Sequence, residues 1–445
     1  MIQLTPQEAM KQIFTDRARI QGWLDFEAAL ARVEATLGMI PKEVAKEISR
    51  KAKVELLDIE KMEETRQQVW LPTVAFIRTF QSICEGDAGQ YIHWGATSQD
   101  LVDTAQMLQL KGAHKVIYQS LRQIEADLLN MAEQHADTVM AGRTHCIHAL
   151  PITFGYKVAI WAREIRRHIQ RLKECRERVF IVQLSSAVGT MASFGSKGPE
   201  VQSLMAKELD LGLPDISWHA SRDRLAEFAN LMSIIAGTLG RIANEVYLLM
   251  STEIGEVCEP WQIGVVGSST MPHKVNPAIS ESMVSLAKKV RYNAALVTEF
   301  MVVDHERDMN FLLGETEALK DSCLIMGELL TYSEDMASNM TVNRRRMKAN
   351  LDILKGLMLS EVVMLELGHK IGKQSAHEVV YEDAMKCIHE GIDFAEALIS
   401  DARVSEHLKE ADIRCLLDPE QYVGLAPQMT RDMVALSRKE REAEE

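Results

Sequence analysis

The sequence is an acidic chain of 445 residues, in which 50 basic and 64 acidic side chains give a formal net charge of −14. It has no basic surplus that could release counterions from phosphates, which argues against a nucleic-acid binder. Disordered and fibrous classes are also excluded, because 47% of the residues are hydrophobic and a chain of this length can bury an ample core. An anionic substrate stays open, since a few local cations suffice to bind one.

The cysteines and the lack of long apolar runs indicate where in the cell the protein is expected. The seven cysteines are scattered, and no two form a Cys-x-x-Cys pair, so the sequence predicts neither a disulfide framework nor a zinc site. The segment MIQLTPQEAM does not have the charge pattern of a secretory signal, and no apolar run approaches the roughly 18 residues that span a bilayer. We expect a soluble cytoplasmic protein that does not bind a membrane.

Long stretches without proline predict long helices, because proline lacks the backbone N–H that a helix interior needs. Four such stretches are rich in good helix formers: 73–150, 152–198, 215–259 and 278–418. Alternating patterns typical of strands are scarce. The sequence therefore predicts an all-α fold with an extended helical bundle.

Apolar residues recur with the helical period in three segments: 101–138, 225–254 and 278–300. The second of these is apolar almost all round. This pattern predicts a helix that is buried on every side, at the centre of a bundle or of an oligomer.

Changes along the chain suggest three domains. A loop-rich motif ends near residue 100, and the basic cluster Arg344–Arg346 marks a second boundary near residue 345. We expect an N-terminal helical domain, a central long-helix bundle and a C-terminal helical domain, at residues 1–100, 101–345 and 346–445. The last domain is expected to contain shorter helices and to end in a solvated charged tail, SRKEREAEE.

The first segment with chemically useful side chains is YIHWGATSQDLVDT, residues 91–104. Thr97, Ser98 and Asp100 stand directly before a predicted long helix, where such residues cap the helix N-terminus. A helix N-terminus with hydroxyls beside it also binds carboxylates. Both interpretations can hold together.

The second segment is AGRTHCIHALPITFG, residues 141–155. His145 and His148 are three apart, which would place them on one face of a helix. A metal site would need a third ligand, so this pair alone is weak evidence for a metal. An imidazole near an arginine and a threonine suits acid–base chemistry, and a histidine that only satisfies backbone groups at a turn is the remaining interpretation.

The third segment is GVVGSSTMPHKVNP, residues 264–277, which interrupts two predicted helices. Gly264 and Gly267 can expose backbone N–H groups that cradle an oxyanion. The segment also supplies two hydroxyls, a cation and an amide, from Ser268, Ser269, Lys274 and Asn276. Serine acts as a base only where N–H donors stabilise its alkoxide. The alternative is a long loop that only connects two helices.

A fourth segment, DHERD at residues 304–308, places five ionisable residues together. It is either a functional cluster or a solvated charge run on a helix. The sequence alone does not decide between the two.

The loop GSSTMPHKVNP resembles the signature GSSxMPxKxNP of the fumarase/aspartase superfamily. GATSQDLVDT resembles the superfamily's first motif and GRTHCIHALPITFG its second, in the same chain order. The similarity is to the branch that contains adenylosuccinate lyase and 3-carboxy-cis,cis-muconate cycloisomerase. It implies a three-domain lyase whose long central helical bundle assembles into the core of a homotetramer, with three subunits contributing to each active site.

Members of this superfamily remove a proton next to a carboxylate and then expel a leaving group, usually releasing fumarate, which needs donors placed for the developing charge. The resemblance implies that Ser268 is the base, that His145 protonates the departing nitrogen, and that Glu281 pairs with a catalytic histidine. It implies substrate contacts for His93, Thr97, Ser98, Thr144, Ser269, Lys274 and Asn276. Side chains and substrate carboxylates suffice for this chemistry, so no metal or organic cofactor is implied.

Two departures from adenylosuccinate lyases concern the nucleotide phosphate. Those enzymes follow HERD with serines and an arginine that hold the phosphate, whereas this chain has Leu312, Leu313 and Thr316. The N-terminal Arg-Tyr pair that helps to bind it is replaced by Leu4 and Thr5. Losing several charge-assisted contacts, each worth about 1.5–3 kcal/mol, disfavours a nucleotide substrate.

Other features resemble the cycloisomerases. These are the sequence WHASRDRLAEFA and the pair Glu315 and Glu317, although Ala220 and Ser221 replace a Thr and a Gln of that family. Cycloisomerases commonly lack the histidine that is present here as His145. A protonating histidine suits nitrogen elimination better than lactonisation.

Three hypotheses follow. The first is a lyase that eliminates fumarate from a small N-substituted aspartate, a dicarboxylate without a nucleotide phosphate. The group on the nitrogen stays open, as does the replacement of the nitrogen by sulfur. The second is a 3-carboxy-cis,cis-muconate cycloisomerase. The third is a homologue that has lost catalysis and serves as a structural or binding protein, against which the presence of Ser268, Lys274, Asn276 and His145 argues.

Overall fold

The structure is a computed structural model that describes residues 4–261 and 267–444. Over these residues it has 18 α-helices and only four short strands, which pair into two two-stranded sheets. The predicted all-α fold is therefore confirmed. Within the same two ranges, no helix combines the length and the apolar character that a membrane span requires.

The chain forms two compact units, each assembled from three stretches of sequence. The first unit comprises Met1–Leu121, His168–Gly240 and Met283–Tyr332, and the second comprises Arg122–Arg167, Arg241–Ser282 and Ser333–Glu445. Several long helices contribute residues to both units. The domain boundaries expected near residues 100 and 345 stay predictions.

Five helices and two 3₁₀ turns form the N-terminal part of the first unit: α1 (Pro6–Ile13), α2 (Asp16–Thr36), α3 (Lys42–Lys51), η1 (Val54–Leu56), α4 (Ile59–Val69), α5 (Pro72–Ile83) and η2 (Ala88–Tyr91). A capping box starts α1, because the Thr5 hydroxyl accepts the Glu8 N–H while the Glu8 carboxylate accepts the Thr5 N–H. Aromatic side chains pack the core, with Trp23 edge-on to Phe76 at a centroid distance of 5.3 Å.

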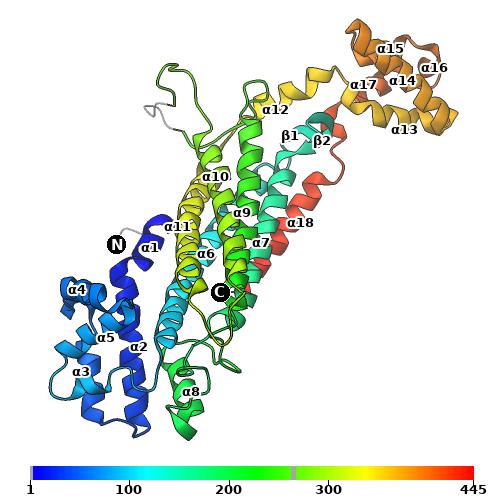
Figure 1. The fold of residues 1–445 in the computed structure, drawn as a ribbon. Coiled ribbons are helices and arrows are strands. Elements are labelled where there is room, and N and C mark those ends of the chain that lie inside the picture. The colour runs from blue at the N-terminus through cyan, green and yellow to red at the C-terminus, as the bar shows by residue number, and fades with distance from the viewer. Residues whose placement is uncertain (1–3, 262–266, 445) are drawn as a thin grey trace. The chain divides into compact units, whose positions relative to one another are not determined.

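Five helices of 22 to 37 residues dominate the middle of the chain (Figure 1): α6 (Ser98–Gln134), α7 (Phe154–Val179), α9 (Asp223–Leu249), α10 (Ala278–Glu299) and α11 (Asn310–Asn339). The shorter elements η3 (Gly195–Lys197) and α8 (Gly198–Glu208) lie between α7 and α9 in the sequence. The helices α6, α9 and α10 correspond to the three segments whose apolar period predicted them. The residues 304–308 lie in the connection between α10 and α11 and not on a helix, so the interpretation as a helical charge run is wrong.

The apolar helix α9 is not buried on every side within one chain. Its residues Ile234, Tyr247 and Leu248 are 51%, 41% and 41% exposed. The nearby helix α10 also exposes apolar surface, at Tyr292 and Leu296. The apolar residues around α9 are therefore more than the rest of a single chain buries.

Buried ion pairs join the helices inside each unit. In the first unit, the guanidinium of Arg222 contacts Asp103 of α6 at 2.8 Å and Glu315 of α11, and all three side chains are buried. In the second unit, Arg166 of α7 contacts Glu125 of α6 at 2.6 Å, with both side chains fully buried. A buried charge that has lost its partner is strongly destabilising, so these pairs hold the helices in one register.

The C-terminal part of the second unit contains short helices and turns: α12 (Arg344–Leu351), η4 (Asp352–Leu354), η5 (Leu357–Leu359), α13 (Ser360–Ile371), α14 (Lys373–Glu390), α15 (Phe394–Ser400), α16 (Ala402–Ser405), α17 (Glu410–Leu416), η6 (Pro419–Gln421) and α18 (Ala426–Glu442). The expected solvated tail is instead mostly helical and paired. Arg438 of α18 contacts Glu133 at 2.7 Å, and Glu444 contacts the buried Arg166 at 2.8 Å. The charges that predicted a solvated tail therefore have partners on α6 and α7.

Candidate active site

The segment around His145 is a β-hairpin of the second unit and not a helix. Strand β1 (Val139–Thr144) pairs antiparallel with β2 (Ile147–Thr153), and Thr144 lies opposite Ile147. The two residues of the turn, His145 and Cys146, have φ values of 52° and 64°. Positive φ at both central positions is the geometry of a type I′ turn. Non-glycine residues reach it at a cost of about 1–2 kcal/mol each, so the hairpin holds the exposed His145 at its tip under strain.

A buried carboxylate fixes this hairpin. Arg143 of β1 donates two hydrogen bonds to Glu256, at 2.9 and 2.7 Å. Asn350 of α12 donates a third, at 2.8 Å, and the Glu256 side chain is fully buried. Glu256 directly precedes strand β3 (Val257–Cys258), which pairs with β4 (Thr341–Val342). The hairpin is thereby tied to the segment that leads into the glycine-rich loop.

The two histidines of this hairpin differ in environment, so their spacing does not make them a pair. His145 is exposed at the tip. His148 lies on β2, and its buried Nδ1 has no hydrogen-bond partner among the described residues. Burial, together with the nearby Arg143 cation, lowers the pKa of His148. Within the described ranges no three His, Cys, Asp or Glu side chains come together in a group that could hold a metal ion.

In the described part of the glycine-rich loop, two backbone N–H groups point to the Ser268 hydroxyl oxygen. Ser268 Oγ accepts the N–H of Met271 at 3.2 Å and, more weakly, that of Thr270 at 3.4 Å. The loop then folds back, so that Asn276 Nδ2 donates to the Gly267 carbonyl at 2.8 Å. A Cβ atom on Gly267 would lie 2.6 Å from the Lys274 carbonyl oxygen, so this close approach requires glycine. Gly264 lies outside the described residues.

Glu259 anchors the far end of the same loop. Its carboxylate accepts the backbone N–H groups of Ile279 and Ser280 and the Ser280 hydroxyl, each at 2.9 Å. These groups belong to the first turn of α10, where unpaired N–H donors favour a carboxylate. Both ends of the loop are therefore closed by hydrogen bonds.

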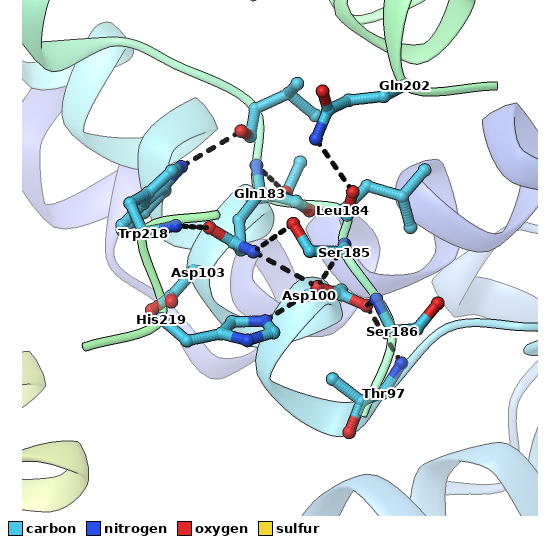
Figure 2. A network of polar contacts seen from close by, with 12 residues as sticks. Thr97, Asp100, Asp103, Gln183, Leu184, Ser185, Ser186, Gln202, Trp218 and His219 are labelled. Atoms are coloured by element: carbon cyan, nitrogen blue, oxygen red, sulfur yellow. Dashed lines mark hydrogen bonds and ion pairs between the residues drawn. The ribbon is translucent and has the colours of Figure 1, made fainter. Parts of the chain in front are cut away.

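In the first unit, Asp100 organises the start of α6 (Figure 2). Its Oδ2 accepts the N–H groups of Thr97 and Ser186, both at 3.0 Å. Its Oδ1 accepts the Ser185 N–H at 2.9 Å and His219 Nε2 at 2.8 Å. The predicted capping role at this helix start is thus performed by a fully buried carboxylate that also binds two distant segments.

The hydroxyls of Thr97 and Ser98 take no part in the hydrogen bonds of Asp100. The Thr97 hydroxyl has no hydrogen-bond partner among the described residues. Ser98 Oγ accepts a hydrogen bond from the Thr73 hydroxyl at 2.9 Å. The N-terminus of α6 therefore keeps polar groups beside it, the arrangement that suits a carboxylate ligand.

His93, a few residues earlier, is held by a carboxylate from α2. Its backbone N–H donates to Glu27 Oε2 at 2.8 Å, and its Nδ1 lies 2.6 Å from Glu27 Oε1. Burial on its own would lower the pKa of His93, but the charges of Glu27 and Asp100 outweigh burial and raise it. An imidazole in this setting favours its charged form.

The candidate residues fall into two groups, one in each unit. The first unit contains His93, Thr97 and Ser98. The second contains Thr144, His145, Ser268, Ser269, Lys274, Asn276 and Glu281. The side chains of Lys274 and Glu281 are exposed and have no ion-pair partner among the described residues. Four supporting carboxylates escaped the sequence analysis, Glu27, Glu256 and Glu259 entirely and Asp100 in all but its capping role.

Two family models match the chain. One, described as lyase, covers residues 3–291, and one described as the adenylosuccinate lyase C-terminus covers residues 356–433. Together they account for most of the sequence, including every candidate residue named above.

Individual proteins match almost the full length. The N-acetyl-S-(2-succino)cysteine lyase of Dickeya dadantii (strain 3937) is 41% identical over 428 residues, which cover 96% of this chain and 93% of that protein. A protein of the same name from Enterococcus italicus is 42% identical over 426 residues, with coverages of 96% and 93%. Among solved structures, the 3-carboxy-cis,cis-muconate lactonizing enzyme from Pseudomonas putida has a TM-score of 0.91 and 35% identity, and 97% of each chain is covered.

Proposed function

Because the chain belongs to the fumarase/aspartase superfamily of lyases, close to adenylosuccinate-lyase-like enzymes, we propose that it releases fumarate from a small succinyl adduct. An S-(2-succino)cysteine derivative is the first candidate substrate, since the names of two similar proteins support it. The N-substituted aspartate expected from the sequence is the second. The atom that leaves the succinyl carbon is sulfur in the first candidate and nitrogen in the second.

The observation that carries this proposal is the environment of Ser268. Backbone N–H groups of Met271 and Thr270 face its Oγ. Donors that face an oxygen stabilise its anionic form and so lower its pKa. A serine in this setting can act as the base that removes the proton next to a substrate carboxylate.

Other residues supply the remaining parts of the reaction. Lys274 provides a cation for the substrate carboxylate, and the second amide hydrogen of Asn276 can donate to it while the first holds the loop. Thr97 and Ser98 offer hydroxyls at the start of α6 for a second carboxylate. His145 is the proton donor to the leaving atom, with Glu281 as the acid that pairs with a catalytic histidine.

The start of α11 supports a substrate without a nucleotide phosphate. Leu313, which stands where adenylosuccinate lyases have a phosphate-binding serine, is 67% exposed. Nearby, Glu315 is committed to the buried ion pair with Arg222, so it is a structural residue and no longer supports a cycloisomerase. An exposed leucine offers no donor to a phosphate.

The leaving atom separates the two substrate candidates. A thiolate, with a parent pKa of about 8.5, can depart as an anion, whereas an amine needs a proton when it leaves. General acid catalysis contributes about 10²–10⁴-fold. Replacing His145 with alanine is therefore expected to reduce turnover of N-succinyl substrates by about that factor and of S-succinyl substrates by less.

Fumarate release, followed by ultraviolet absorbance, tests the proposal. The panel contains S-(2-succino)cysteine with and without an N-acetyl group, N-succinyl amino acids, adenylosuccinate and 3-carboxy-cis,cis-muconate. Ser268→Ala is expected to lose about 10²–10⁴-fold in kcat, whereas Thr270→Ala, which leaves the backbone donor in place, is expected to retain activity. Lactone formation without fumarate release would establish the cycloisomerase, and inertness toward the whole panel would establish the non-catalytic homologue.

We also propose that the protein is a homotetramer with active sites shared between subunits. The exposed apolar residues of α9 and α10 support this assembly, because a large apolar surface on an isolated chain marks an interaction site. Light scattering on the purified protein measures the assembly directly. Ile234→Glu on α9 is expected to reduce the mass, and an unchanged tetramer in that variant would contradict the role of this surface.

A further inference from the structure

The contact between Glu27 and His93 joins two segments that are 66 positions apart in the sequence. One carboxylate oxygen accepts the His93 backbone N–H and the other contacts the ring nitrogen Nδ1, at 2.8 and 2.6 Å. The Glu27 side chain is 1% exposed. A buried carboxylate that binds both the backbone and the ring of one histidine fixes where that ring points.

The backbone of His93 depends on the same contact. Its φ is 65°, a left-handed conformation that is strained for a non-glycine residue. A hydrogen bond to an ionised carboxylate, such as the one from its N–H to Glu27, is stronger than one between neutral groups. The carboxylate can therefore offset the backbone strain that turns the ring toward its present direction.

The other ring nitrogen is left available. Nε2 of His93 has no hydrogen-bond partner among the described residues, and the side chain retains 14% exposure. Glu27 occupies Nδ1, so a ligand can only be recognised through Nε2. A histidine fixed at one nitrogen and open at the other is the arrangement by which carboxylates orient functional imidazoles.

We propose that Glu27 is a positioning residue, which clamps His93 so that its Nε2–H is presented to a carboxylate of the anionic substrate. This inference rests on the proposed function, because it assigns a role within the same site. Glu27 does not touch the substrate and acts only through His93. The charged groups that face the His93 ring are Glu27 on α2 and Asp100 on α6, and both favour its protonated form.

Glu34 provides a matched control. It lies seven residues after Glu27 on the same helix, and it is fully buried. Neither of its carboxylate oxygens has a partner among the described residues. Burial, together with the Glu27 charge, raises its pKa to about 9, so it is neutral at physiological pH. Glu34→Gln therefore changes a buried acid of α2 without removing a charge or a contact to His93.

The test compares Glu27→Gln, Glu27→Asp and Glu34→Gln in the full-length assembled protein. Removing the Glu27 charge removes the main group that raises the pKa of His93, so the proton is lost at lower pH. The basic limb of the kcat/KM profile is expected to move down by about 1–3 pH units in Glu27→Gln. Glu27→Asp should restore part of the shift, and Glu34→Gln should superimpose on the wild type.

A second readout is independent of turnover. The affinity for fumarate, measured by calorimetry as a function of pH, is expected to decline at lower pH in Glu27→Gln than in the wild type. An unchanged pH dependence in Glu27→Gln, in either measurement, would overturn the positioning role, as would equal shifts in Glu27→Gln and Glu34→Gln. If no succinyl adduct is turned over but fumarate binding shifts as expected, the proposed function fails while the clamp stands.

Discussion

Replacing Asp100 with asparagine would remove one of the two acceptor atoms on which the start of α6 depends. Oδ1 of this carboxylate accepts from Ser185 and His219, whereas Oδ2 accepts the N–H groups of Thr97 and Ser186. An asparagine keeps one oxygen and places an NH₂ group on the other side. Whichever way the amide turns, at least two donors that are satisfied now would face another donor, and on the Oδ1 side Gln183 Nε2 is a third.

The magnitude follows from the burial of this site. The Asp100 side chain is fully buried, with 0% of its surface accessible to solvent, so water cannot replace the lost acceptor. Each unsatisfied buried donor costs about 1–3 kcal/mol, and two such donors predict a loss of about 2–6 kcal/mol. Where the NH₂ group takes the place of Oδ2, the Thr97 N–H is one of the donors that lose their acceptor, so kcat/KM should fall together with stability.

Urea unfolding at fixed protein concentration measures this effect, with Asp127→Asn as the control. Asp127 lies on the same helix and accepts hydrogen bonds from Gln123 and Ser338 near the surface. Its replacement is expected to cost less than about 1 kcal/mol, because lone surface polar contacts contribute little. Equal midpoints for the two variants would refute the idea that Asp100 is the buried organiser of the helix start.

Three further predictions concern other parts of the chain. Gly267→Ala is expected to lower kcat/KM by about 10²-fold with little change in melting temperature, because a Cβ atom 2.6 Å from the Lys274 carbonyl oxygen must displace the loop. Full activity of this variant would show that the loop closes differently. Cys146→Gly is expected to raise stability by about 0.5–1 kcal/mol in thermal unfolding, since glycine relieves the φ of 64° in the hairpin turn; a lower melting temperature would contradict the strain. Because the folded chain raises the pKa of Glu34 from 4.5 to about 9, it holds a proton that the unfolded chain releases, so stability should decline as pH rises through that window. Urea unfolding of Glu34→Gln at acidic and alkaline pH should show a smaller decline, and identical pH dependences would contradict the shift.

The long helices could be predicted from the sequence because their signals are local. The apolar period and the missing prolines set α6, α9 and α10 within a few residues. The hairpin of His145 was missed because neither β1 nor β2 alternates, and a bulge near Gly142 shifts their register. The pairing of the two strands depends on the backbone geometry of the turn and of the bulge, which the periodicity of the side chains does not predict.

The supporting carboxylates could not be predicted for a different reason. Asp100 and His219 are 119 positions apart, and Arg143 and Glu256 are 113 apart. The fold brings such residues together, and no spacing in one sequence signals their contact. The family motifs pointed to residues of the loop and of the helix start, whereas the residues that hold them lie outside those motifs or, like Asp100, act through distant partners.

The pairing of the C-terminal segment with the long helices bears on how the protein is made. Arg166 is fully buried, and two of its three carboxylate partners, Glu440 and Glu444, lie at the C-terminal end of the described chain. Arg441 bonds the backbone of Arg122, 319 positions earlier. On the ribosome, α6 and α7 emerge long before these partners exist. The second unit therefore cannot complete its charge pairing until α18 and Glu444 have been synthesised, so its closure is expected to be a late step of folding.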